Sequence, residues 1–113
     1  MFFQLHLKFE ELYTQAALQV DELAERALAL GGQPIPTLAG ALERARLDEA
    51  AQGLDATGMV RDLAEDLSRL MGWLREGAKS AGEADDTATL NLLDGLADVH
   101  EKDAWMLRAF LEA

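Results

Sequence analysis

The chain has 113 residues, enough for one domain, and half of them are hydrophobic, so a core can form. Ten basic and 21 acidic residues give a net charge of −11, and no basic arm or stripe is present. Nucleic-acid affinity depends on Lys and Arg contacts to phosphate, so nucleic acid is a disfavoured partner and cations are favoured. Cysteine is absent, which excludes disulfides, thiolate metal sites and cysteine nucleophiles.

Neither a membrane span nor a signal peptide is expected. No apolar run approaches the roughly 20 residues that a membrane-spanning helix needs. The first residues, Met1 to Lys8, lack the basic leader and the cleavage site of a signal peptide. The absence of cysteine fits a reducing compartment. A cytoplasmic protein is therefore predicted.

The first long helix is predicted from Phe2 to Leu30. Leu, Ala, Glu and Gln dominate this stretch, and neither Gly nor Pro interrupts it. Gly31-Gly32 ends the helix, because glycine adopts the left-handed conformation that often follows a helix, and Pro34 and Pro36 prevent its continuation. Apolar residues cover more than one face of this helix. A partner beyond a three-helix bundle is therefore expected, either another subunit or a missing helix.

A short helix and a polar connection are predicted next. The short helix runs from Leu38 to Leu47, and Thr37 is its expected N-cap. The connection runs from Asp48 to Gly58.

Two further long helices are predicted, the first from Met59 to Ala81 and the second up to Leu111. The second is capped by Asp85 or Asp86, and His100 on its apolar stripe is expected to be buried and hydrogen-bonded. Both stripes repeat at spacings of three and four residues. Their members are Val60, Leu63, Leu67, Leu70, Leu74 and Ala78, and then Leu90, Leu93, Ala97, Ala104, Leu107 and Leu111.

These elements predict the fold class. Three long helices joined by short turns form an antiparallel bundle, and one short connecting helix accompanies them. The chain is therefore expected to be all-α, with a single helical domain over residues 1–113.

Four side chains that can bind metal share one face of the first helix: His6, Glu10, Asp21 and Glu25. With His6 at 0° and 100° per residue, all four fall within an arc of about 100°. Glu11 and Glu22 lie at about 140–160°, on a different face. The four are therefore not a random sample of an acidic helix.

One chain cannot join the four into one site. Fifteen residues separate His6 from Asp21, about 22 Å along a helix. The four positions average 15.5, so two copies of the helix can cross antiparallel around a two-fold axis near Gln15 and Ala16. The first ligand pair of one chain then meets the second pair of the other, and the site forms twice. One imidazole and three carboxylates suit Fe(II) or Mn(II). Solvated side chains on an ordinary acidic helix are the alternative.

Several segments resemble the Dps family of mini-ferritins. They are Phe2–Tyr13, Val20–Arg26, Leu30-Gly31-Gly32 and Trp105–Phe110, together with the short helix between the first two long ones. The resemblance covers essentially all 113 residues.

The resemblance implies a ferritin-like bundle, a ferroxidase centre at a dimer interface and a hollow shell of twelve subunits. Iron(II) is oxidised at this centre, preferentially by hydrogen peroxide, and ferric mineral is stored inside, which protects against oxidative damage. By motif match His6 is the family's second-helix histidine, and Glu10 stands where Asp is usual. Asp21 and Glu25 match the carboxylates contributed by the partner chain. These four are the expected metal-binding and catalytic residues.

The chain also departs from the family pattern. Mini-ferritins begin with another long helix, which carries a His-Trp pair, and Met1 stands at that junction. We therefore expect the first bundle helix, one histidine ligand and any basic DNA-binding tail to be absent, by truncation or as a reduced natural variant.

Two functions remain open at this point. The first is a ferroxidase-type oxidoreductase that stores iron, with metal ions and hydrogen peroxide as partners. The second is a truncated, non-catalytic acidic helical oligomer with a metal-binding or assembly role. DNA compaction is disfavoured by the charge of −11. In either case we expect a homo-oligomer.

Overall fold

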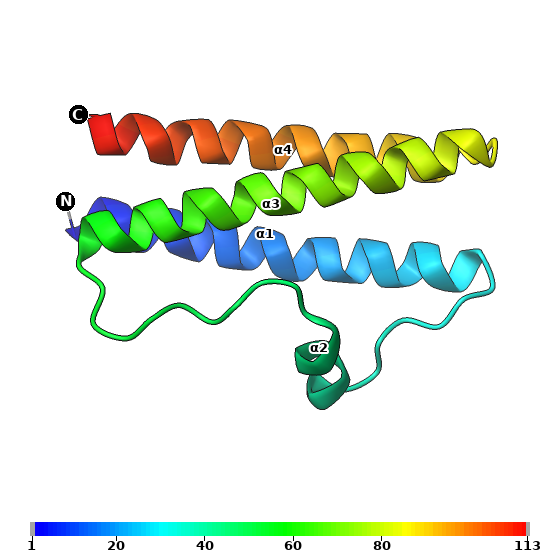
Figure 1. Cartoon of the computed structure of the whole chain (residues 1–113), viewed down its shortest axis with the longest axis horizontal. Coiled ribbons are helices and arrows are strands. Elements are labelled where there is room, and N and C mark those ends of the chain that lie inside the picture. Colours follow the sequence, from blue (N-terminus) through cyan, green and yellow to red (C-terminus); the bar gives the residue numbers. More distant parts are fainter. Residues whose placement is uncertain (1, 113) are drawn as a thin grey trace. The chain divides into compact units, whose positions relative to one another are not determined.

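The structure is a computed structural model that describes residues 2–112. This range contains four α-helices and no strand (Figure 1). The helices are α1 (Phe2–Ala29), α2 (Leu38–Arg44), α3 (Ala56–Glu83) and α4 (Thr87–Glu112). The prediction of three long helices and one short helix is confirmed. None of the described helices combines the length and the apolar character that a bilayer crossing requires.

The predicted glycine stop ends α1. Gly31 has a φ of +83°, in the left-handed region. The Gly31 and Gly32 amides donate to the carbonyls of Leu28 and Ala27, at 3.0 and 2.8 Å. These bonds satisfy carbonyls that the last helical turn leaves open.

Side-chain caps set the starts of α2 and α3. Thr37 accepts a hydrogen bond from the Gly40 amide at 3.0 Å, as predicted. Asp55 likewise accepts from the Gly58 amide at 2.8 Å, so α3 begins at Ala56 rather than at Met59. The prediction that the connection extends to Gly58 was wrong, because an aspartate cap places this glycine in the first helical turn.

The end of α2 also differs from the prediction. The helix stops at Arg44, three residues before the predicted Leu47, because Ala45 is extended, with φ −61° and ψ 138°. The sequence around it has no glycine or proline to mark this stop.

Asp86 is the cap of α4. It accepts a hydrogen bond from the Thr89 amide at 3.1 Å. Asp85, the other candidate, has a φ of +59° and so forms the turn instead. Aspartate is among the non-glycine residues that tolerate this conformation.

The chain divides after Ala45 into two compact units, one containing α1 and α2 and the other containing α3 and α4. In the second unit a tight turn makes α3 and α4 an antiparallel hairpin (Figure 1). Its two predicted stripes are buried or half-buried along their whole length. One cluster of the core consists of Leu74, Leu96 and Ala97, with Leu70, Met71, Leu92 and Leu93 packed against it.

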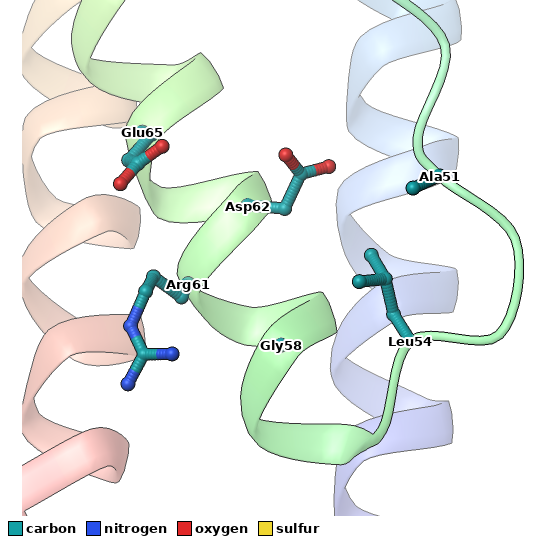
Figure 2. A pocket seen from close by; sticks show the side chains of 6 residues that line it. All are labelled: Ala51, Leu54, Gly58, Arg61, Asp62 and Glu65. Carbon is teal, nitrogen blue, oxygen red and sulfur yellow. The ribbon is translucent and has the colours of Figure 1, made fainter.

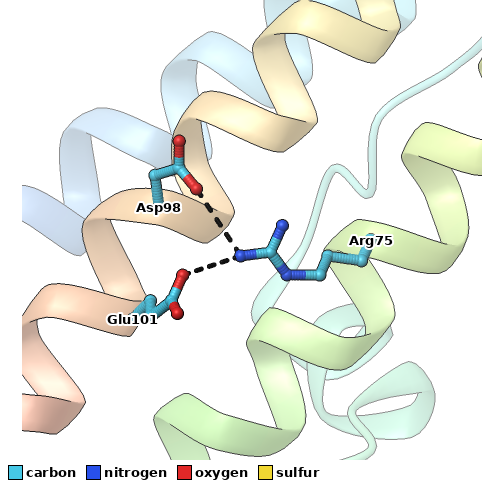
Figure 3. Close-up of polar contacts among 3 residues, drawn as sticks. All are labelled: Arg75, Asp98 and Glu101. Atoms are coloured by element: carbon cyan, nitrogen blue, oxygen red, sulfur yellow. Dashed lines mark hydrogen bonds and ion pairs between the residues drawn. The ribbon is translucent and has the colours of Figure 1, made fainter.

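Polar contacts lie on the surface of the second unit. The Arg75 guanidinium donates to Glu101 at 2.8 Å and to Asp98 at 3.5 Å (Figure 3). All three side chains are exposed, so each pair contributes at most about 1 kcal/mol. The Arg46 guanidinium lies over the Trp73 ring, 5.2 Å from its centroid, and joins the connecting segment to α3.

His100 is buried on α4, with 3% of its surface exposed, as predicted. The second half of that prediction was wrong. Neither of its ring nitrogens has a hydrogen-bond partner among the described residues. Burial lowers the pKa of the imidazole, and the charge of Asp103 partly opposes this shift.

Candidate metal centre

All four predicted ligands are exposed side chains of α1: His6, Glu10, Asp21 and Glu25. They form two pairs, each within one turn of the helix, and the pairs are about 22 Å apart along the axis. Among residues 2–112, no three His, Asp or Glu side chains lie close enough together to hold a metal ion. A site that combines both pairs therefore needs a second copy of α1, as the spacing predicts.

The four predicted ligands lie on the side of α1 opposite its buried residues. Leu5, Leu12 and Gln19 are the buried residues of this helix. On a helical projection they fall at about 220–260° from His6, whereas the ligands centre near 50°. We call the side centred on the ligands the ligand face.

Large, exposed apolar side chains also lie on the ligand face. Six of them are 60–78% exposed and fall within about 90° of its centre: Phe3, Leu7, Tyr13, Leu18, Val20 and Leu28. Two small residues lie on this face at about 0–20°: Ala17, between the two pairs, and Ala24, between Asp21 and Glu25. A helix face that only meets water seldom gathers so many apolar side chains, whereas contiguous exposed apolar surface marks interfaces. The ligand face therefore has the composition of an interface with polar residues at set positions.

The ligand face is also strongly acidic. Three of its four potential ligands are carboxylates, and together with one imidazole they form a donor set for a divalent cation. Lys8, the basic residue between His6 and Glu10 in sequence, is 3.4 Å from Glu11 and lies at about 200°. Its charge is thus directed away from the ligand face.

A separate pocket of about 250 Å³ lies between the start of α3 and the segment that precedes it. Figure 2 shows that Asp62 points toward this segment, whereas Arg61 and Glu65 point to the other side of α3. The three charged groups do not converge, so the pocket does not form a metal site. Sequence reasoning did not single out these residues.

Comparisons with known proteins place this geometry in context. The family model for the ferritin-like domain matches residues 1–113. The DNA protection during starvation protein of Brevibacillus brevis is 50% identical over 111 residues, which cover 98% of this chain and 74% of that protein. DNA protection during starvation protein 2 of Bacillus anthracis is 48% identical over 110 residues, covering 97% and 75%.

Solved structures agree with these relatives. A crystal structure of a Dps protein from Bacillus brevis has a TM-score of 0.95 at 50% identity, covering 97% of this chain and 74% of that one. A Dps structure from Vibrio cholerae, described as a member of a broad superfamily of ferritin-like diiron-carboxylate proteins, has a TM-score of 0.92 at 38% identity, covering 97% and 69%. These likenesses confirm the predicted fold class, a ferritin-like helical bundle.

Proposed function

Because this chain belongs to the Dps family of ferritin-like proteins, we propose that it binds Fe(II), oxidises it with hydrogen peroxide and stores the ferric product. Such a reaction removes both Fe(II) and peroxide, and so protects against oxidative damage. The observation that carries the proposal is the ligand face of α1, where one histidine and three carboxylates share one exposed, partly apolar side of the helix.

In the proposed site two copies of α1 cross antiparallel. His6 and Glu10 of one chain then meet Asp21 and Glu25 of the other chain. The apolar side chains of the ligand face become buried in the same contact, and Ala17 and Ala24 allow the two helices to approach. Two equivalent sites form per pair of chains.

One imidazole and three carboxylates suit the oxidation of Fe(II) to Fe(III). Three carboxylates offset the charge of the bound iron, and they stabilise the more highly charged Fe(III) more than Fe(II). The imidazole adds a neutral nitrogen donor, which requires an unprotonated His6. Two Fe(II) ions each lose one electron, the O–O bond of peroxide breaks, and two protons are taken up to form two water molecules.

The first experiment follows ferric absorbance after Fe(II) and hydrogen peroxide are added to the full chain. The double variant His6→Ala/Asp21→Ala should oxidise Fe(II) at least about tenfold more slowly. The control Glu11→Ala/Glu22→Ala, which removes two acidic groups outside the ligand face, should retain the rate of the parent. Equal rates for the parent and the ligand variant would refute the proposed site.

A second readout does not depend on turnover. Co(II) should bind to the parent and to the control variant and give a visible absorption spectrum, and binding should be lost in His6→Ala/Asp21→Ala. Co(II) binding without Fe(II) oxidation would contradict the catalytic role. It would support the alternative function, an acidic helical oligomer that binds metal without catalysis.

A further inference from the structure

His100 lies in the most tightly packed part of α4. Ala97 and Ala104, one turn away on either side, have no exposed surface, and Leu107 is 2% exposed. The imidazole itself is 3% exposed, and neither nitrogen has a hydrogen-bond partner among the described residues. A residue that packs like an apolar one, but can gain a charge near neutral pH, therefore stands at the centre of this helix.

Few charges can compensate a proton on this ring. On α4, Asp103 is buried one turn away, and its charge acts on the imidazole. Asp98 and Glu101 of α4 are exposed and bind Arg75 of α3. The other charged residue of α4 at this level, Lys102, is exposed, and the charged residues of α3 between the buried Leu67 and Ala78 are all exposed: Arg69, Arg75 and Glu76.

We propose that His100 is an acid-sensitive switch of the α3–α4 hairpin: a proton on its buried imidazole drives α4 out of its packing against α3. A buried cation is stable only with a partner or with water, and opening the hairpin supplies the water. Asp103 limits the effect, because its carboxylate attracts the imidazolium.

The direction of the pH dependence follows from linkage. Burial lowers the pKa of His100 in the folded chain below the value near 6.5 of an exposed histidine. The unfolded chain therefore binds the proton more readily, and stability is lost as the pH falls below about 6.5. Stability that depends on neutral His100 is fully present above this pH.

The chain is well suited to a clean test, because it has two histidines. His6 is exposed on α1, and His100 is buried on α4. Urea unfolding of the full chain would be measured at pH 7.5, 6.5 and 5.5 with a chelator present. Between pH 6.5 and 5.5 the unfolding equilibrium constant of the parent should rise by up to about fivefold relative to that of His100→Leu. The control Val99→Ala, which changes an exposed neighbour of His100 without removing a titratable group, should keep the pH dependence of the parent.

Histidine ring titration by NMR gives a second readout on the unaltered protein. The His100 signal should titrate below the pH of about 6.5 that is usual for an exposed histidine, and Asp103→Asn should lower its midpoint further. The proposal is overturned if His100 titrates at or above a pH of about 6.5, or if His100→Leu and the parent share one pH dependence. These measurements involve no iron, so their outcome is independent of the proposed ferroxidase function.

Discussion

At the scale of single residues, the excess of acidic groups affects the pKa of Asp66 on α3. Burial raises the pKa of this carboxyl, and the nearby Asp62 adds to the shift, while Arg69 opposes it. The Arg69 guanidinium is 3.3 Å from the Asp66 carboxylate. Since the charged form of Asp66 is less favoured in the folded chain than in the unfolded one, ionisation of Asp66 lowers stability as the pH rises.

Asp66→Asn should therefore raise the melting temperature at pH 7. The gain should disappear near pH 3.5, where the carboxyl is protonated in the folded chain. Thermal unfolding at both pH values measures the effect, and Glu76→Gln, at an exposed position of α3, is the control. A lower melting temperature at pH 7 would show that the ion pair with Arg69 outweighs burial and repulsion.

At the scale of helices, two glycines inside α3 have different surroundings. A Cβ atom added at Gly72 would meet no described atom within 4 Å. At Gly77 the added Cβ would lie 2.9 Å from Leu93 Cδ1, because α4 approaches closely there. Glycine destabilises a helix interior relative to alanine. Alanine at either position therefore gains the same helix propensity, and the difference between the two variants measures the effect of packing against α4.

Gly72→Ala should stabilise the chain by about 1 kcal/mol in urea unfolding. Gly77→Ala gains the same propensity but must displace Leu93, so its net gain should be smaller or negative. A loss of stability in Gly72→Ala would contradict the open surroundings of this residue. It would indicate that another chain packs against this side of α3.

The helices could largely be predicted from the sequence, because their signals are local. Gly31, Thr37 and Asp86 act on backbone groups within a few residues, so their roles follow from spacing. The end of α2 has no such residue, and the Asp55 cap is masked by Gly58, a residue type that favours a connection rather than a helix. The missing hydrogen bond of His100 could not be predicted, because it depends on which residues other elements place beside it.

At the scale of the whole molecule, α1 carries apolar residues on two opposite sides. One side carries the buried Leu5 and Leu12, and the other carries the predicted ligands among exposed apolar residues. The arc of the four ligands could be predicted, since it depends only on helix geometry. Their meeting across two chains stays a prediction, because one chain holds only half of each proposed site.

The separation of the two predicted ligand pairs along α1 predicts complementation between variants. If each site takes His6 and Glu10 from one chain and Asp21 and Glu25 from the other, two inactive variants should complement each other. A mixed pair of His6→Ala and Asp21→Ala chains has one intact site and one site with both defects.

Co-expression of differently tagged variants, followed by purification on both tags, should therefore restore Fe(II) oxidation that neither variant shows alone. Mixing His6→Ala with Glu10→Ala should restore nothing, because both changes affect the same half of the site. Recovery in that second mixture, or none in the first, would contradict the proposed pairing of His6 and Glu10 with Asp21 and Glu25 of another chain. The pattern of recovered activity in the two mixtures would thus report the symmetry of the assembly without a structure of the complex.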